Sequence, residues 1–128
     1  MSYAILAAGV LTCLIGIIHS FLGERLIFQS VRKDEIVPTQ APKPLRERHL
    51  RIMWATWHLP SVFGLCLGVL LIYLGLDIAL LQTTVGRFAV AVIGTMMLIS
   101  AALVAYATNA RHPGWVGMGL VAILCLVG

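Results

Sequence analysis

Four apolar segments constrain the fold of this chain more than any other feature. Three of them cover residues 3–22, 52–76 and 87–108, and the first contains no charged side chain. A helix needs about 20 apolar residues to cross the roughly 30 Å hydrocarbon core of a bilayer, so each of these three is long enough to span it. The last segment, residues 113–128, is shorter, and we predict that it forms a short fourth span.

The composition favours a membrane protein over a soluble domain. Hydrophobic residues make up 60% of the 128 residues, charged residues make up 11%, and the mean hydropathy is +0.98. Soluble domains carry about 25% charged residues. We therefore predict an all-α integral membrane bundle of four transmembrane helices in one domain, residues 1–128. Its only long loop is residues 23–51. The N-terminal segment lacks the basic flank and cleavage site of a signal peptide, so we expect a retained span.

Lysine and arginine residues are unequally divided between the two ends of the predicted bundle. Eight of the nine lie in residues 23–51 or in the turn at 109–114, and only Arg87 belongs to the other end. Cytoplasmic loops carry such an excess. We therefore predict a multi-pass protein of the inner (plasma) membrane with both termini outside. Topology also accounts for the net charge of +4, so the lipid bilayer is the expected partner and nucleic acid is not.

Small residues recur at helix-packing spacing in two of the predicted spans. Thr12, Gly16 and Ser20 follow one another in the first span, and Gly64 and Gly68 form a G-x-x-x-G pattern in the second. Such faces let two helices approach closely, either within one chain or between two copies. A homodimer is therefore one expectation. The three cysteines all lie in apolar segments without a C-x-x-C neighbour, and we expect them to be packing residues.

Titratable side chains gather at the predicted cytoplasmic end. His19 lies near the end of the first span, Glu24 follows it, His58 lies about two turns into the second span, and His112 lies in the last turn. Ionisable residues inside a membrane are costly and commonly functional. Imidazole and carboxylate groups together suit zinc, copper, iron or nickel. We therefore predict that His19, Glu24, His58 and His112 bind a divalent metal ion or a small ligand.

One face of the second span carries polar and aromatic residues at helical spacing, namely Arg51, Trp54, His58 and Ser61. We expect Arg48 and Arg51 to contact an anion or lipid headgroups. Pro60 is expected to bend this helix and to free the carbonyl of Thr56, which a hydroxyl of Thr56 or Ser61 would satisfy.

Two other functions fit the same residues. His19 and His58 could hold a haem b for redox or quinone chemistry. Alternatively, the two histidines hydrogen-bond to each other, to Ser20, to Ser61 or to a carbonyl and hold the helices in register, as in a structural or assembly subunit. Whether the chain is an enzyme stays open, because it contains no P-loop, G-x-S-x-G or H-E-x-x-H motif. A small multidrug exporter is disfavoured, because no carboxylate precedes Glu24.

The string His19–Ser20–Phe21–Leu22–Gly23–Glu24, together with the later pair Trp57–His58, resembles short bacterial inner-membrane proteins that are uncharacterised. The shared pattern is H-S-x-L-G-E. The resemblance covers two short patches of the chain and implies no activity, cofactor or residue role.

Overall fold

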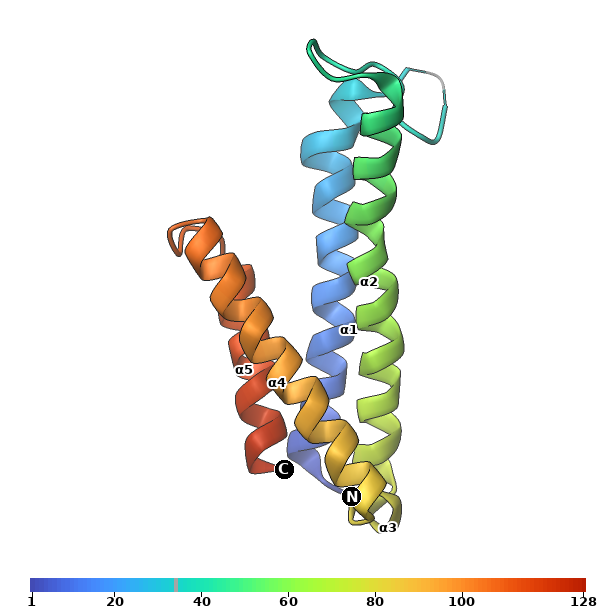
Figure 1. The fold of residues 1–128 in the computed structure, drawn as a ribbon. Helices are drawn as coiled ribbons and strands as arrows, with labels where there is room; N and C mark the ends of the chain where they lie inside the picture. The colour runs from blue at the N-terminus through green and yellow to red at the C-terminus, as the bar shows by residue number, and fades with distance from the viewer. Residues whose placement is uncertain (34) are drawn as a thin grey trace.

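The chain folds into two antiparallel helical hairpins (Figure 1). The computed structural model describes residues 1–33 and 35–128, and its long helices are α1 (Tyr3–Gly23), α2 (Glu47–Leu76), α4 (Thr84–Ala107) and α5 (Gly114–Val127). The described residues contain no strand, so the all-α prediction is confirmed. Three helical segments are long and apolar enough to cross a membrane, and α5 is a shorter apolar helix.

The first helical segment continues past its predicted end at residue 22. It runs on through a π-helical turn, η1 (Glu24–Phe28), and a 3₁₀ turn, η2 (Gln29–Val31). Gly23 keeps a helical backbone, with φ −58° and ψ −44°, and does not break the segment. The helix continues because residues 24–31 contain neither glycine nor proline.

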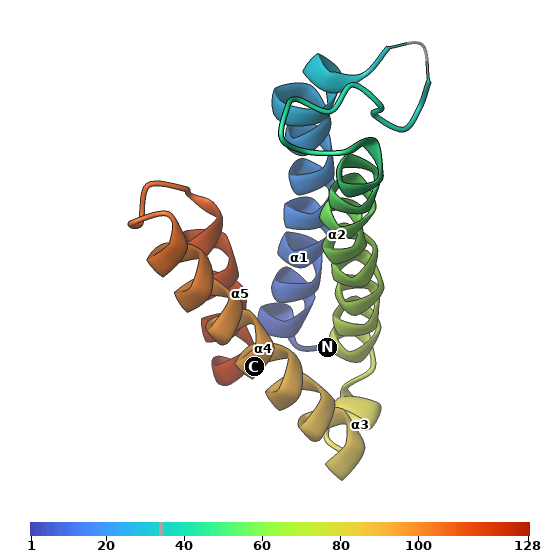
Figure 2. The ribbon, with the colours of Figure 1, turned by 45° about the horizontal axis from the view of Figure 1, so that its top comes forward.

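The second helix extends beyond the predicted span at residues 52–76 toward the preceding loop. It starts at Glu47, three residues after the last of the prolines that keep the preceding chain extended, Pro38, Pro42 and Pro44. Outside the helices, the described residues between α1 and α2 are 32–33 and 35–46, so both helical segments extend into the predicted cytoplasmic loop at 23–51. These residues cross over the ends of α1 and α2 (Figure 2).

Helix α2 continues through Pro60 without interruption. The hydroxyl of Thr56 donates to the carbonyl oxygens of Ile52, at 2.8 Å, and Met53, at 3.2 Å. The hydroxyl of Ser61 has no hydrogen-bond partner among the described residues. The prediction that one of these hydroxyls satisfies the carbonyl of Thr56 is therefore wrong, and a bend at Pro60 stays a prediction.

Glycines bring the backbones of α1 and α2 into contact. A Cβ atom at Gly9 would lie 2.7 Å from the carbonyl oxygen of Gly68, and one at Gly68 would lie 2.8 Å from that of Gly9. A Cβ atom at Gly75 would lie 2.7 Å from the amide nitrogen of Leu6. Only glycine fits at such distances. Gly68 of the predicted G-x-x-x-G pattern thus serves packing within the chain, whereas at Gly64 the nearest atoms would be 3.9 Å away.

The second hairpin contacts the first mainly through α5 and α1, whereas α2 and α4 barely touch. A single turn, α3 (Ile78–Leu81), leads from α2 to α4. The core lies toward the chain termini and contains Ile5, Ala8, Leu71, Leu74, Leu81, Val90, Ile93, Met97, Val121, Ala122 and Cys125. All three cysteines are free.

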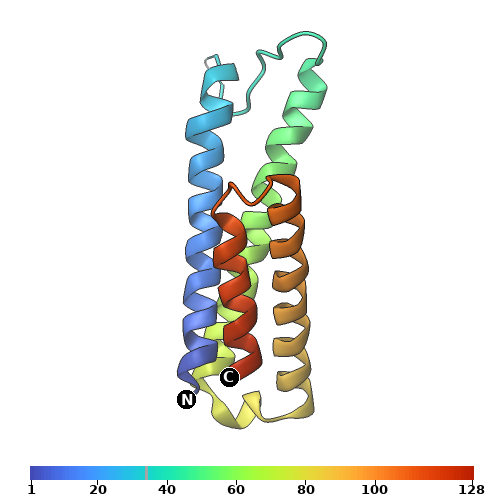
Figure 3. The same cartoon turned by 90° about the vertical axis from the view of Figure 1, so that its left-hand side faces the viewer.

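The two hairpins differ in length. Both chain termini lie at one end of the molecule, and the turn between α4 and α5 stops well short of the far end of α1 and α2 (Figures 1 and 3). We call that far end, where residues 32–46 connect α1 to α2, the loop end. The part of the first hairpin nearest the loop end therefore extends beyond the second hairpin.

Candidate functional site

The indole of Trp57 fills the space between α1 and α2 beside Gly23. It stacks on the imidazole of His19, with ring centroids 4.6 Å apart and planes 9° from parallel. Its Nε1–H donates to the carbonyl oxygen of His19 at 3.2 Å. A Cβ atom at Gly23 would lie 2.5 Å from Cε2 of Trp57, so the ring needs a glycine there. Trp57 therefore packs between the two helices.

His19 returns a hydrogen bond to the same residue. Its Nε2 lies 3.1 Å from the carbonyl oxygen of Trp57. A carbonyl only accepts, so Nε2 carries the hydrogen and donates. A nitrogen that donates in this way has no lone pair left for a metal ion or a haem iron, and only Nδ1 of His19 retains one.

His58 faces α1 from the next position on α2. Its Nδ1 lies 2.7 Å from the hydroxyl oxygen of Ser20, and its Nε2 lies 3.4 Å from Oε2 of Glu24. Trp54 meets the imidazole edge-on, with centroids 4.9 Å apart, and donates from Nε1 to the same Glu24 oxygen at 3.1 Å. In the neutral imidazole with hydrogen on Nε2, Ser20 donates to Nδ1. Nε2 lies near the carboxylate of Glu24 but makes no hydrogen bond with it. Both nitrogens of His58 therefore face partners from its own chain.

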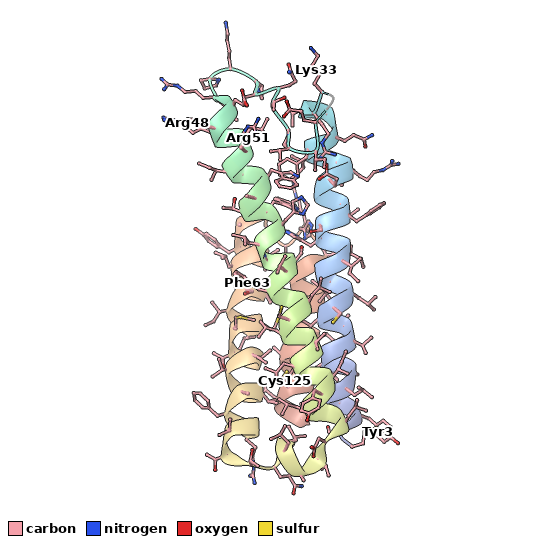
Figure 4. The ribbon with its side chains drawn as sticks, turned by 90° about the vertical axis from the view of Figure 1, so that its right-hand side faces the viewer. Tyr3, Lys33, Arg48, Arg51, Phe63 and Cys125 are labelled. Atoms are coloured by element: carbon pink, nitrogen blue, oxygen red, sulfur yellow. The ribbon has the colours of Figure 1, made fainter. Side chains whose placement is uncertain are left out.

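Glu24 is the centre of this group of side chains. Its second carboxylate oxygen forms an ion pair with the guanidinium of Arg32, and the two side chains are only 29% and 25% exposed. The helical segment continues past Gly23 for about two further turns. Arg32 comes directly after η2, the last of these turns. We call Ser20, Glu24, Arg32, Trp54 and His58 the loop-end cluster. Side chains with nitrogen atoms fill the space between α1 and α2 toward this end of the hairpin (Figure 4).

Two pairs of residues with helical spacing explain how the cluster forms. Ser20 and Glu24 are four residues apart on the first helical segment, and so are Trp54 and His58 on the second. Residues four apart share a helix face. The spacing is visible in the sequence, yet Arg32 is not recognisable there as a site residue, because the sequence places it in a loop whose charges indicate topology.

The predicted ligand set is only partly brought together. Glu24 and His58 are in contact, and His19 lies beside them on Trp57. His112 is exposed in the turn before α5, where its Nδ1 accepts from the amide of Gly114 at 3.0 Å. Within residues 1–33 and 35–128, no group of three or more His, Cys, Asp or Glu side chains could hold a metal ion. The geometry therefore gives the metal site no support.

The two arginines predicted to contact an anion or a lipid differ in their surroundings. Arg51 is engaged by carboxylates, with Nε 2.8 Å from Oε1 of Glu47 and a terminal nitrogen 3.4 Å from Oε2 of Glu35. Arg48 donates from Nε to Nε2 of His49 at 3.4 Å and has no carboxylate partner among the described residues. Arg51 thus shares its charge with two carboxylates, whereas Arg48 has no such partner among the described residues, and contact of either arginine with an anion or a lipid stays a prediction.

Some buried atoms of the cluster have a charged neighbour but no hydrogen bond. They are Oε1 of Glu24, Nε of Arg32 and Nε2 of His58. The hydroxyl of Ser61, one turn along α2, is also buried without a hydrogen bond. A buried polar atom without a hydrogen bond costs about 1–3 kcal/mol. The ion pair between Glu24 and Arg32 offsets part of this cost.

Comparisons with known proteins do not assign the chain to a family. No family model, no curated protein and no solved structure matches it. The resemblance of the H-S-x-L-G-E patch to uncharacterised inner-membrane proteins stays an expectation, and the function has to be argued from the site itself.

Proposed function

We propose that this protein is a small four-span protein of the bacterial inner membrane that acts as a structural or assembly component. The loop-end cluster clamps α1 to α2 at the cytoplasmic surface. The observation that supports this proposal is that the polar side chains of the loop-end cluster find their partners within the chain itself. His58 contacts Ser20 and Glu24, and Glu24 contacts Arg32 and Trp54, so each helix supplies partners to the other. The hydrogen bonds between Ser20 and His58 and between Trp54 and Glu24 join the two helical segments and hold them at a fixed register.

The position of the cluster relative to the second hairpin supports a location at the membrane surface. Gly117 faces Ile15 and Gly128 faces Ile5, so α5 runs antiparallel to α1. Continuing this pairing at 1.5 Å per residue brings the turn before α5 level with Ser20. That turn ends the second hairpin, so the bilayer surface would lie near the same level. The cluster and the basic residues beyond it would then lie at the cytoplasmic interface.

The proposed orientation has both termini outside and residues 32–46 in the cytoplasm. A cysteine placed at Lys43 in a cysteine-free variant is expected to react with a membrane-impermeant maleimide only in inverted vesicles. A cysteine placed at Gln82 is expected to react in intact spheroplasts. The two positions lie at opposite ends of the molecule, so labelling in the reverse pattern would show that the orientation is wrong.

Analysis of the purified protein distinguishes the metal-binding and haem-binding alternatives from the structural role. We expect less than one-tenth of an equivalent of bound transition metal by elemental analysis, on the order of background. We also expect no Soret band and no thermal stabilisation by added Zn²⁺ or Ni²⁺. The reason is that His19 donates from Nε2 and both nitrogens of His58 face Ser20 and Glu24.

A matched variant makes this experiment decisive. A stoichiometric metal or haem that is lost in His58→Gln, while the variant keeps its helical circular dichroism, would overturn the structural role and establish a ligand site. Glutamine retains a donor and an acceptor at that position, so this variant is expected to fold.

A further inference from the structure

An apolar groove of about 290 Å³ lies on the first hairpin near its loop end. Five residues of η1 and α2 line it: Ile27, Phe28, Met53, Thr56 and Trp57. Phe28 is only 1% exposed, whereas Ile27 and Met53 are 39% and 46% exposed. The hydroxyl of Thr56 donates to the backbone of its own helix. The groove therefore offers an apolar surface to a binding partner.

The groove lies beyond the level at which the hydrocarbon of the bilayer ends in the proposed orientation. Ser20 marks that level on α1, and His58, which contacts Ser20 at 2.7 Å, marks it on α2. Ile27 is seven residues beyond Ser20 and Met53 is five residues beyond His58. At 1.5 Å per residue they lie about 10 Å and about 8 Å farther out, whereas the headgroup layer is about 5–8 Å thick. Acyl chains therefore do not cover this surface.

The groove continues the face of the first hairpin that the second hairpin covers. On α2, Met53 lies 18 residues, about five helical turns, before Leu71, which is fully buried in the core. On α1, Ile15 packs against the core and faces Gly117 of α5. Leu22, seven residues farther along the same face, is 39% exposed. Because α4 and α5 end well short of the loop end (Figures 1 and 3), these faces are covered near the chain termini and open at the groove.

Positive charge accompanies the groove at both levels. Farther out on α2, His49 lies four residues before Met53, and its Nε2 accepts from Nε of Arg48 at 3.4 Å. Toward the membrane, Arg111 is exposed in the turn between α4 and α5, near the level of Ser20. No carboxylate in the described ranges lies within 4.0 Å of Arg48 or Arg111. These arginines favour a partner with negative charge.

A second copy of this chain does not match the groove in charge. Residues 23–51 contain seven lysines and arginines and four aspartates and glutamates, so the loop end has a net positive charge. Among the carboxylates described at this end, Glu24, Glu35 and Glu47 each face an arginine of their own chain. Two such surfaces would bring like charges together, which opposes binding. The charge therefore favours a different, acidic protein.

We infer that the groove binds an acidic amphipathic helix of a partner protein at the cytoplasmic surface. The apolar face of that helix lies on Ile27 and Met53, and its carboxylates face Arg48 and Arg111. An amphipathic helix recognises an apolar groove through residues at positions i, i+3, i+4 and i+7. This inference rests on the proposed role as an assembly component and names the class of partner.

The binding of two synthetic peptides to the full chain in phosphatidylcholine nanodiscs tests the inference. Both peptides are amphipathic helices with leucine on the apolar face, and the polar face carries glutamate in one and lysine in the other. Fluorescence anisotropy of the labelled peptides measures binding, with empty nanodiscs as the baseline. The acidic peptide is expected to bind about tenfold more strongly than the basic peptide. The variant Ile27→Ser/Met53→Ser is expected to weaken binding of the acidic peptide about tenfold, because it removes the apolar contact. Arg48→Gln/Arg111→Gln is expected to reduce the preference for the acidic peptide to less than about threefold.

Two controls change the loop end without changing the groove lining. Ile36→Ser/Leu45→Ser removes two exposed apolar side chains, and Lys33→Gln/Lys43→Gln removes two positive charges. Both controls are expected to bind the acidic peptide as the parent protein does.

Equal binding of the two peptides by the parent protein would overturn the inference, and so would equally strong binding of the acidic peptide to empty nanodiscs. Losses in the controls as large as those in the groove variants would overturn it as well. Helical circular dichroism checks the fold of each variant, and Met53→Ser alone is expected to weaken binding about threefold if the double variant does not fold. Failure of the structural role is distinguishable, because it is measured by the coupling between Glu24 and Trp54, which do not line the groove.

Discussion

Replacing Gly68 with alanine is expected to destabilise the α1–α2 hairpin by about 2–3 kcal/mol, although the change adds only one methyl group. The new Cβ atom would lie 2.8 Å from the carbonyl oxygen of Gly9 and 3.0 Å from the amide nitrogen of Cys13. Both neighbours are backbone atoms of α1, so neither can move aside without moving the helix. The measurement is the free energy of unfolding in detergent, followed by circular dichroism or by exposure of a buried cysteine.

Gly64→Ala is the matched control, because Gly64 lies one turn away on the same helix. A Cβ atom there would meet nothing nearer than 3.9 Å, which is an ordinary van der Waals contact. Alanine is the better helix former, so this variant is expected to be neutral or more stable by up to about 1 kcal/mol. Equal effects of the two substitutions would mean that α1 and α2 do not pack through Gly68.

Glu24→Gln is expected to cost about 1–3 kcal/mol, the second large effect. The amide keeps the shape of the side chain and can still accept from Trp54, but it leaves the shielded guanidinium of Arg32 without a counter-charge. It also removes the charge that faces His58. A charge that loses its partner while shielded from water is more costly than one at an open surface.

The same substitution at Glu47 is the control for Glu24→Gln. Glu47 also pairs with an arginine, Arg51, but both side chains are about half exposed. An exposed ion pair contributes about 0–1 kcal/mol. Glu47→Gln is therefore expected to change the free energy of unfolding by less than about 0.5 kcal/mol, within the range of that principle. A cost as large as that of Glu24→Gln would show that the loop-end cluster is an ordinary set of surface charges.

The number and order of the long helices are predictable from the sequence because apolar runs are long and unambiguous. The ends of these helices are harder to predict. Residues 24–31 contain two charged residues, and charged residues at the end of an apolar segment favour the prediction of a loop. The backbone nevertheless stays helical there, because the segment contains neither glycine nor proline. The helical segment therefore extends past residue 22, the predicted end of the first span.

The location of the candidate site is predictable from the sequence, but the contacts between its residues are not. His19 and His58 do lie at one level between two helices, as their distance from the loop predicts. Their partners, however, depend on the rotation of each helix about its axis, and an apolar sequence with small residues on several faces does not specify that rotation. The close fit of Trp57 on Gly23 selects one rotation, in which His19 contacts Trp57 and His58 contacts Glu24.

A double-mutant cycle on Glu24→Gln and Trp54→Phe tests most directly whether the loop-end cluster holds the two helical segments together. The hydrogen bond of 3.1 Å between Trp54 and Glu24 joins these segments. Phenylalanine keeps an aromatic ring at position 54 and removes only the indole donor. We expect the two substitutions to be coupled by at least about 1 kcal/mol in the free energy of unfolding, as for a hydrogen bond to a charged group. Additivity within about 0.3 kcal/mol would show that the helices are not held together at this cluster, and would contradict the structural role.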